Sequence, residues 1–436
     1  MKIAIVVQRY GADINGGAEQ HARYIAERLA PHASVEVVTT CARDYVTWRN
    51  ELPAGVEQVN GISVRRFPVS HERKPHEFGR RSFQVFENTH SLADELRWLD
   101  SEGPASRELV DYVERAAPGL DFVVLFSYRY YHAWHLARRI PGKAVIVPTA
   151  ERDPAIGLAM FGPVLRGVRA LMYNSPEERA MIQAAANNAA VPGVVVGVGS
   201  DVPDRVEPER FRGKFKMTRP FAIYIGRIDE NKGCPEMFSH FQRYAAAFPH
   251  GLDLVLIGSA IIDVPQHPRI HHLGFLDDRD KFDALAASDL LIMPSYYESL
   301  SMVALEAWAL GRPVLANAHC DVLKGQCNRS NAGLYYESYE EFVEALYSLE
   351  SNGPLHARLG RNGREFFTRN YAWPVIERKY LDMFAQLKRD LPSAARRHGA
   401  GGGHGMEPLP GWWARRTKTL PPARDVLERI PRGSAA

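Results

Sequence analysis

The sequence predicts an α/β protein with two Rossmann-like domains, each built on a doubly wound parallel sheet. Three observations lead to this prediction. The chain has 436 residues, which fits two to three domains. Short β-branched apolar runs alternate with stretches in which apolar residues recur every three or four positions, as strands alternate with helices in a parallel sheet. The alternation starts again near residue 220, so two halves of similar size follow one another.

The first half opens with a strand, a loop that contains glycines, and a helix. Residues 3–7 form a continuous apolar run, as expected for a strand buried on both faces. Residues 18–30 carry helical spacing, and a second strand is predicted at 35–40. Further strands are predicted at 122–126, 144–147, 170–173 and 193–196.

The second half repeats this pattern. A strand is predicted at 221–225, followed by the loop GRIDENKG and a helix that begins near Cys234. Further strands are predicted at 252–257, 270–273, 290–293 and 313–316, and further helices at 302–310, 340–349, 355–370 and 374–389.

Changes in composition suggest the domain boundaries. We expect an N-terminal domain at residues 1–200 and a C-terminal domain at 201–375. Residues 202–220 are rich in proline and charge, so we interpret them as the linker. Residues 392–436 are rich in glycine and proline, and we predict that they are mostly a disordered tail.

Composition and charge exclude several classes of protein. Lys and Arg number 54 against 51 Asp and Glu, a net charge of +3 that argues against a dedicated nucleic-acid binder. The four cysteines are scattered and show no CxxC spacing, which fits neither a disulfide scaffold nor a zinc site. The N-terminus lacks the features of a signal peptide, and no window of about 18 apolar residues could span a membrane. We therefore expect a cytoplasmic protein with reduced thiols and no zinc site.

The strongest chemical signal is the loop GRIDENKG at residues 226–233. Ligands in open α/β sheets bind beyond the carboxyl ends of strands, and this loop directly follows a predicted strand. Arg227 and Lys232, with Gly226 at the start of the loop, suit a diphosphate, since Arg offers a forked donor and Lys a point charge. The alternative is an exposed charged turn. The spacing is not that of a Walker loop.

The second signal is PSYYESLSMVALEA at residues 294–307, with Glu298 in a loop and Glu306 on the following helix. The helix N-terminus near residues 301–303 offers backbone N–H groups to an anion, and Glu306 can accept hydrogen bonds from a ribose diol. A glycosidase pair is disfavoured, because a full helix would separate the two carboxylates by roughly 12 Å, beyond the usual range of about 5–9.5 Å. For Glu306 alone, a solvated helix acid is the other alternative.

A third and weaker signal is the pair Gly16-Gly17, in the loop between the first strand and the first helix. Glycines at this position allow the backbone to approach a phosphate. The spacing is not GxGxxG, so an ordinary turn remains an alternative.

Taken together, the motifs resemble the retaining glycosyltransferases of family four, which have the GT-B fold and include many bacterial polysaccharide and lipopolysaccharide enzymes. The matching residues are Gly16-Gly17, the GRxxxxKG of residues 226–233, and Glu298-x7-Glu306, within about residues 1–391. The resemblance implies two domains facing a central cleft, with the acceptor on the N-terminal side and the nucleotide sugar on the C-terminal domain. A helix at 376–391 is expected to cross back to the N-terminal domain.

The resemblance also implies a role for each matching residue. Arg227 and Lys232 would neutralise the departing diphosphate, and Glu306 would bind the ribose hydroxyls. Glu298 would contact the donor sugar, and Gly17 would bring its backbone to the pyrophosphate. Backbone amides near the sugar and β-phosphate would come from Ser299, Leu300, Ser301 and Met302. Such enzymes normally need no metal and no dedicated base, since the departing phosphate takes the acceptor proton.

One position departs from the family pattern. Many relatives carry a histidine after an N-domain strand, whereas here the strand at 144–147 leads to Glu151. An ionised Glu accepts hydrogen bonds where His can donate them. We hypothesise that Glu151 contacts a sugar hydroxyl near the reaction centre. The alternative is a structural salt bridge with Arg152, and the change leaves open an altered donor preference.

We therefore predict a retaining hexosyltransferase that moves a sugar from a nucleotide-diphosphate donor to a glycan or lipid-linked hydroxyl acceptor, in cell-surface glycan assembly at the inner face of a membrane. The rival predictions are a non-catalytic nucleotide- or glycan-binding relative and an NAD-dependent oxidoreductase, which would need the missing GxGxxG. Residues 71–86 (HERKPHEFGRRSFQVF) are basic and aromatic. They are either a surface for an anionic membrane or lipid-diphosphate acceptor, or a solvated loop and helix.

Overall fold

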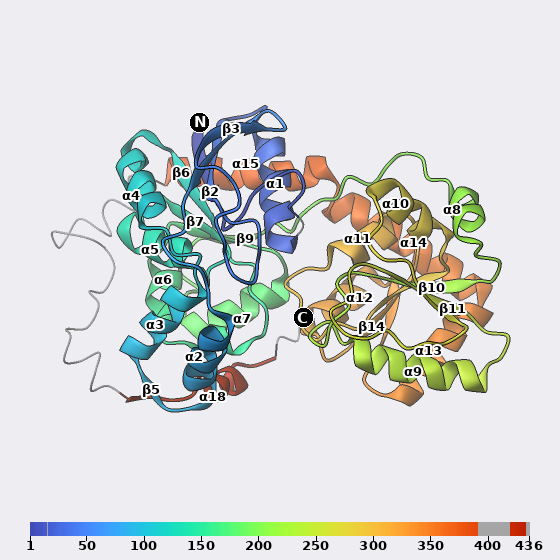
Figure 1. The fold of residues 1–436 in the computed structure, drawn as a ribbon. Coiled ribbons are helices and arrows are strands. Elements are labelled where there is room, and N and C mark those ends of the chain that lie inside the picture. Colours follow the sequence, from blue (N-terminus) through green and yellow to red (C-terminus); the bar gives the residue numbers. More distant parts are fainter. Residues whose placement is uncertain (15, 391–418, 433–436) are drawn as a thin grey trace. The chain divides into compact units, whose positions relative to one another are not determined.

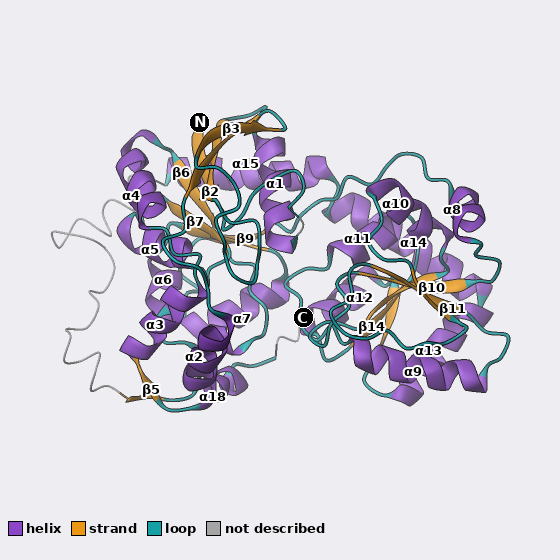
Figure 2. Ribbon diagram, viewed as in Figure 1, coloured by secondary structure: helices purple, strands orange, loops and turns teal. Residues whose placement is uncertain are grey.

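The computed structural model describes residues 1–14, 16–390 and 419–432. The chain divides into two units: Met1–Gly197 with the described residues from Glu377 onward, and Val198–Ile376. Each unit is built around one predominantly parallel sheet with helices packed against it (Figures 1 and 2). The predicted class, α/β with two parallel-sheet halves, is confirmed.

The sheet of the first unit has eight strands in the order β3-β4-β2-β1-β6-β7-β8-β9. Neighbouring strands are parallel, except for the antiparallel hairpin of β3 and β4. The central strands are continuous apolar runs because both faces of the sheet are covered. The bounds are β1 (Lys2–Val6), β2 (Ser34–Thr40), β3 (Gly55–Val59), β4 (Ile62–Phe67), β6 (Phe122–Phe126), β7 (Ala144–Val147), β8 (Ala170–Tyr173) and β9 (Gly193–Val195).

The helices of the first unit begin at residues suited to cap them. Ser91 and Asp94 form a reciprocal capping box at α3, and the side chain of Ser175 caps α7. The bounds are α1 (Gly17–Leu29), α2 (Pro75–Glu87), α3 (Leu92–Glu102), α4 (Arg107–Ala116), α5 (Tyr131–Arg139), α6 (Phe161–Gly167) and α7 (Pro176–Ala186), with the 3₁₀ helices η1 (Ala117–Gly119) and η2 (Pro154–Gly157).

The second unit has a six-stranded sheet in the order β12-β11-β10-β13-β14-β15, with every pair parallel. Its strands are β10 (Phe221–Ile225), β11 (Asp253–Ile257), β12 (Ile270–His272), β13 (Leu290–Met293), β14 (Val314–Asn317) and β15 (Gly333–Tyr336). Its helices are α8 (Pro208–Phe215), α9 (Cys234–Ala247), α10 (Asp278–Ala287), α11 (Met302–Ala309), α12 (Asp321–Ser330), α13 (Tyr339–Ser351) and α14 (Gly353–Asn370).

Helix α15 (Trp373–Arg389) begins in the second unit and is part of the first from Glu377 onward. In the first unit, Phe384 stacks on Phe122 of β6, with ring centroids 4.9 Å apart. The Tyr380 hydroxyl lies 3.3 Å from Nε2 of His21 on α1. These contacts join the end of the helix to the first sheet.

The segment expected to be a linker, residues 202–220, contains helix α8. Phe211 of this helix is fully buried, and Arg210 lies 2.6 Å from both Asp280 and Asp283 of α10. The interpretation of this whole segment as linker is wrong, because one apolar side chain and an ion-pair cluster hold it on the second unit.

The prediction of a disordered tail at 392–436 is wrong for residues 419–432. Strand β16 (Thr419–Leu420) pairs with β5 (His90–Ser91), and helix α18 (Ala423–Arg429) packs on η2 and α2. Ala423 and Ile430 belong to the core cluster of the first unit, which explains why this segment is ordered. The remainder of the predicted tail, residues 392–418 and 433–436, lies outside the described residues.

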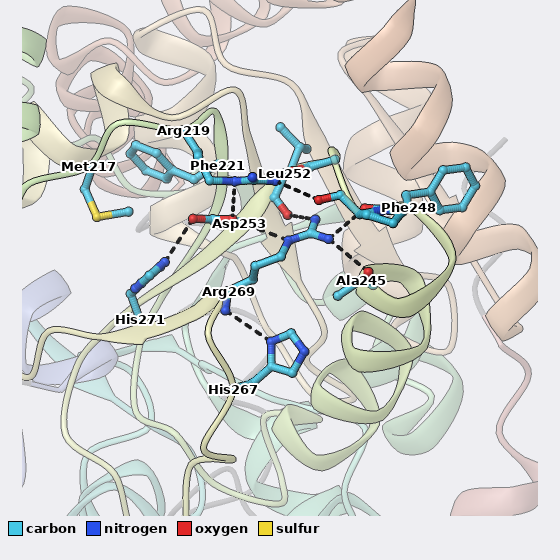
Figure 3. A network of polar contacts seen from close by, with 12 residues as sticks. Met217, Arg219, Phe221, Ala245, Phe248, Leu252, Asp253, His267, Arg269 and His271 are labelled. Carbon is cyan, nitrogen blue, oxygen red and sulfur yellow. Dashed lines mark hydrogen bonds and ion pairs between the residues drawn. The ribbon is translucent and has the colours of Figure 1, made fainter.

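A network of polar contacts around the buried Asp253 closes the amino ends of β10, β11 and β12 (Figure 3). Asp253 lies within ion-pair distance of Arg219, Arg269 and His271, with separations of 3.0, 3.4 and 3.0 Å. Arg269 also donates hydrogen bonds to the carbonyls of Ala245, Phe248 and Leu252. The network therefore lies at the end of the sheet opposite the carboxyl edge, where ligands bind in this architecture.

All four cysteines are buried as thiols outside any disulfide. Among the described residues, none of the helices combines the length and apolar character needed to cross a bilayer.

Candidate functional site

The candidate residues of the second unit follow the carboxyl ends of β10 and β13, which are adjacent in the sheet. Residues 226–233 follow β10, and residues 294–301 follow β13 and lead into α11. Both predicted motifs therefore come to the same edge of one sheet.

The GRIDENKG loop is folded around a residue that the sequence analysis did not single out. Asp229 is 6% exposed, and its carboxylate accepts hydrogen bonds from Nε of Arg227 and, at 2.8 Å, from the backbone N–H of Lys232. The Arg227 carbonyl accepts a hydrogen bond of 2.7 Å from the hydroxyl of Tyr224. The Arg227 side chain is 45% exposed, so its guanidinium lies at the surface of the loop while the Arg227 backbone is held in place.

Lys232 and Glu298, predicted from separate motifs, meet in the structure. The ammonium of Lys232 lies 2.8 Å from Oε1 of Glu298. Their side chains are 27% and 12% exposed, which limits screening of the pair by water. The two motifs are thus joined by a direct ion pair.

The backbones of the two loops also touch. Gly233 has φ +69°, and a Cβ there would lie 2.1 Å from the carbonyl oxygen of Pro294. Gly258, directly after β11, is equally constrained, because a Cβ there would lie 2.0 Å from the Gly226 carbonyl oxygen. Glycines in the motif and after β11 therefore allow close packing of three loops at the sheet edge.

Glu306 is buried on α11 rather than solvated, since it is only 2% exposed. Its Oε1 accepts a hydrogen bond of 2.8 Å from the hydroxyl of Ser200 and lies 3.2 Å from the ammonium of Lys281 on α10. Its Oε2 is buried and has no hydrogen-bond partner in the structure. A buried acceptor with spare capacity suits a hydroxyl-bearing ligand.

Lys281 is the main residue of this site that the sequence analysis missed. Burial disfavours its charged form, but the nearby carboxylates of Glu306 and Asp278 outweigh that effect and raise the pKa of the amine. Lys281 lies 25 positions before Glu306 in the chain, so no local motif connects the two. Helix α10, which carries Lys281, is capped by Asp277, whose side chain accepts a hydrogen bond from the backbone N–H of Asp280.

The N-terminus of α11 has the predicted arrangement of a capped helix. Ser301 is the N-cap, and its hydroxyl accepts a hydrogen bond of 3.2 Å from the backbone N–H of Ala304. Met302 is the first residue of the helix, and Leu300 is buried just before it. Ser299 lies in the same loop. The start of α11 carries the partial positive charge of the helix and presents free backbone N–H groups. It follows Glu298 closely in the chain.

In the first unit, Gly16 and Gly17 lie at the start of α1. Gly16 is the extended N-cap, and a Cβ there would lie 2.3 Å from Oε2 of Glu19. Glu19 in turn forms a buried ion pair with Arg9, with 2.6 Å between Oε1 and Nη2. A Cβ on Gly17 would meet nothing within 4 Å, so this backbone is open to approach.

Glu151 lies in the loop after β7, within a strained and heavily bonded segment. Thr149 has φ +47° and Ser127, after β6, has φ +65°; both are unusual for residues other than glycine. Their hydroxyls lie 2.7 Å apart. The backbone N–H of Ala150 donates a hydrogen bond of 2.5 Å to the buried carboxylate of Glu178. Strain held in this way is typical of functional loops.

No group of three or more His, Cys, Asp or Glu side chains that could hold a metal ion occurs among residues 1–14, 16–390 and 419–432.

In a comparison with protein families, residues 206–366 match the family described as "Glycosyl transferases group 1". Among curated proteins, the chain is 31% identical over 205 residues to a phosphatidyl-myo-inositol mannosyltransferase of Propionibacterium freudenreichii, covering 44% of this chain and 50% of that protein. It is 28% identical over 177 residues to the lipopolysaccharide core biosynthesis glycosyltransferase LpsE of Rhizobium meliloti, covering 38% and 50%. The chain spans about half the length of these curated relatives.

Solved structures resemble nearly the whole chain at low sequence identity. A sucrose-phosphate synthase from Thermosynechococcus elongatus has a TM-score of 0.65 and 18% identity, covering 90% of this chain and 99% of that one. Anabaena HepE in complex with UDP has a TM-score of 0.62 and 16% identity, covering 88% and 100%. These structures share the GT-B fold, and at such identities they establish the fold alone.

Proposed function

Because its second unit belongs to the group 1 glycosyl transferases, we propose that this chain transfers a sugar from a nucleotide-diphosphate donor to a hydroxyl acceptor, with retention of anomeric configuration. The observation that carries the proposal is the arrangement around β10 and β13. It combines a lysine–glutamate pair, a helix N-terminus and a buried carboxylate with one unpartnered oxygen.

Each part of this arrangement suits one part of the donor. Arg227 and Lys232 supply positive charge for the diphosphate, and the start of α11 adds backbone N–H groups. Glu306 accepts a hydrogen bond from a ribose hydroxyl through Oε2, while Ser200 and Lys281 hold Oε1. The donor is thus bound by charge at one end and by a buried acceptor at the other.

The chemical benefit comes from charge that develops as the sugar leaves. The diphosphate gains negative charge while the sugar gains oxocarbenium character, so cations fixed around the leaving group stabilise the transition state more than the ground state. Glu298 balances Lys232 before the donor arrives, at 2.8 Å. When the donor binds, the Lys232 ammonium contacts both the Glu298 carboxylate and the diphosphate. The Glu298 carboxylate then lies beside the donor sugar.

The first unit supplies the acceptor side in this proposal. Gly17 offers open backbone at the start of α1 for the pyrophosphate, and Gly16 is fixed there by Arg9 and Glu19. Glu151 contacts a sugar hydroxyl from its loop after β7. The names of the relatives, which act in lipopolysaccharide core synthesis and on phosphatidyl-myo-inositol, support a lipid-linked or cell-surface glycan acceptor.

The first experiment measures thermal stabilisation by UDP, GDP, ADP, CDP and NAD. A ligand at about 100 times its Kd adds about 2.7 kcal/mol to the free energy of unfolding. We expect one nucleoside diphosphate to stabilise the wild type, with UDP tested first because HepE was solved with it. Glu306→Gln keeps the shape of the side chain and should lose most of the stabilisation. Glu350→Gln, a carboxylate that accepts from the Tyr244 hydroxyl in the same unit, is the matched control.

Turnover and product configuration then separate the proposal from its rivals. The nuclear magnetic resonance spectrum of the product with the matching donor should show the donor's anomeric configuration. Stabilisation by NAD alone would support an oxidoreductase and refute the proposal. Binding of a nucleoside diphosphate without turnover on any hydroxyl acceptor would leave a non-catalytic binding protein. Full activity of Glu151→Gln would refute the role given to Glu151.

We also propose that α2 contacts an anionic membrane surface at the inner face of the cell membrane. Not every residue of the basic region 71–86 can contact a membrane. Arg73 is buried and lies 2.9 Å from Glu102, and Val85 belongs to the core. Phe83 is 64% exposed, and Arg80 is exposed one turn before it. An exposed aromatic ring beside a basic side chain suits the interface of an anionic bilayer.

Liposome flotation tests this contact. The wild type should float with vesicles that contain anionic phospholipid and remain unbound to neutral vesicles. The variant Arg80→Glu with Phe83→Ser should lose flotation. Arg358→Glu, an exposed arginine on α14 of the second unit, should keep it. Equal flotation with neutral and anionic vesicles would refute the proposal.

A further inference from the structure

The described C-terminal residues 419–432 are an integral part of the first unit. Besides the β16–β5 pairing, Ala423 is fully buried and Ile430 is 5% exposed, both in the core cluster. Gly157 of η2 lies directly beneath α18, since a Cβ there would be 2.2 Å from the carbonyl oxygen of Ala423. Arg424 adds a bidentate ion pair to Glu87 of α2.

One side chain joins this segment to the loop after β7. The guanidinium of Arg152 donates hydrogen bonds to the carbonyls of Leu427, Ile430 and Pro431, at 3.2, 2.6 and 3.3 Å. These carbonyls lie at the C-terminal end of α18, where a helix leaves acceptors unsatisfied and where positive charge is favoured. Arg can bind three carbonyls at once because its donors form a rigid fork.

The residues on either side of Glu151 are all fixed, each to a different element. Ala150 donates its backbone N–H to Glu178 of α7. Asp153 accepts from the guanidinium of Arg129 at 2.5 Å, and its other oxygen accepts from the N–H of Ala155 at 2.9 Å. Arg152 makes the contacts with α18, so the C-terminal segment is one of the three anchors of this loop.

We infer that Arg152 is a positioning residue for the proposed transfer reaction, and that the C-terminal segment 419–432 fixes the Glu151 loop through it. This inference rests on the proposed function and on the role of Glu151 there. In this loop the Arg152 guanidinium contacts the C-terminal end of α18, and the Asp153 carboxylate contacts Arg129. Glu151 directly precedes both residues, and the backbone that positions it is held by their contacts.

Two variants release the loop from opposite sides of the contact. Arg152→Gln removes the fork that binds the three carbonyls. Gly157→Ala leaves every charge in place but puts a methyl group into the Ala423 carbonyl, which displaces α18. The matched controls are Arg179→Gln, an exposed arginine on α7, and Gly142→Ala, where a Cβ meets nothing within 4 Å.

Hydrogen exchange of the full-length chain tests the mechanical coupling without any assumption about activity. Both variants should raise the exchange rates of the α18 amides at least tenfold. They should also raise the exchange of the Ala150 amide and its neighbours at 149–153, whereas the controls change neither. Faster exchange in α18 with unchanged exchange at 149–153 overturns the inference, whether or not the protein transfers sugar.

Steady-state kinetics then test the effect on the reaction. We expect kcat to fall about tenfold in Arg152→Gln and Gly157→Ala. Nucleoside-diphosphate affinity should stay within twofold of wild type, because neither substitution touches the residues proposed to bind the nucleotide. Arg152→Lys, which keeps the charge but not the fork, should recover part of kcat. Unchanged kcat with a released loop overturns the positioning role. If the wild type itself transfers nothing, the proposed function fails, and the exchange result still decides the coupling.

Discussion

Gly233 shows how a single residue fixes the geometry of the candidate site. It has φ +69°, and its Cα faces the Pro294 carbonyl so closely that any Cβ would lie 2.1 Å from that oxygen. Both atoms belong to backbone, so the clash cannot be relieved by moving a flexible side chain. The loop that carries Lys232 is therefore held directly against the loop that carries Glu298.

We predict that Gly233→Ala costs about 1–3 kcal/mol of unfolding free energy, measured by urea denaturation, because it combines backbone strain with overpacking. Nucleoside-diphosphate affinity should fall in parallel, since the two loops must separate. Gly213→Ala, on helix α8 with open space around the new methyl, is the control and should be neutral or slightly stabilising. Equal stability of both variants would contradict the close approach of the loops.

At this scale the sequence predicts residues that lie within one motif and misses those that meet across the fold. Lys232 and Glu298 are found because each belongs to a local pattern at a strand end, and the structure pairs them. Lys281 and Ser200 are missed because their partner, Glu306, is far away in the chain. Burial of Glu306 depends on packing of α11, which no local spacing reveals.

Among the elements, the sequence identifies the buried strands well and the edge strands poorly. Strands β6, β7, β8, β10 and β13 have their predicted bounds, because full burial demands an unbroken apolar run. The hairpin of β3 and β4 was not predicted. Strand β3 (GVEQV) lies at the edge of the sheet and is mostly exposed, so its composition resembles that of a loop. Helix α8 was missed for a similar reason, since a single buried phenylalanine gives no periodic signal.

The charge network at the amino ends of β10, β11 and β12 makes a prediction about elements. Asp253 is 4% exposed and faces three basic side chains (Figure 3). Asp253→Asn leaves Arg219 and Arg269 without their counter-charge, and we expect a loss of about 3–5 kcal/mol in unfolding free energy. Nucleoside-diphosphate affinity should stay within twofold of wild type, because the network closes the end of the sheet away from the site.

Calorimetric and urea unfolding of the folded variant, together with nucleotide titration, measure the two quantities separately. Asp263→Asn changes an exposed carboxylate of the same unit and should alter neither. A loss of nucleotide affinity in Asp253→Asn without a loss of stability would show that the amino ends of the strands influence binding directly.

For the whole molecule, buried histidines predict that the first unit is the more sensitive to acid. Burial lowers the pKa of His21 and of His132 to about 3 and that of His135 to about 4. In the unfolded chain these side chains titrate near pH 6.5. The unfolded state therefore binds more protons as the pH falls below 6.5, and stability falls with it. In the described part of the second unit, His240 is the one histidine with a lowered pKa.

One buried carboxyl in the first unit opposes this effect. Burial raises the pKa of Glu178 to about 8, so between pH 6.5 and its unfolded value near 4.5 the folded state binds the extra proton and gains stability on acidification. Near pH 5 the unfolded state binds about three more protons than the folded state at the histidines, and the folded state binds about one more at Glu178. The unfolded state therefore binds about two more protons in all, and the free energy of unfolding falls by about 2.7 kcal/mol per pH unit of acidification. His90 has a raised pKa and is protonated in both states there, so it adds no slope.

Hydrogen exchange in increasing urea at pH 7.5, 6 and 5 reports each unit separately through its own peptides. The first unit should lose stability steeply between pH 6 and 5, while the second changes much less. His21→Gln, which retains a polar side chain opposite the Tyr380 hydroxyl but cannot take up a proton, should flatten the slope of the first unit by about 1.4 kcal/mol per pH unit. An unchanged slope in that variant would mean that His21 is protonated in the folded chain. Steeper loss in the second unit would mean that groups other than the buried histidines govern acid unfolding.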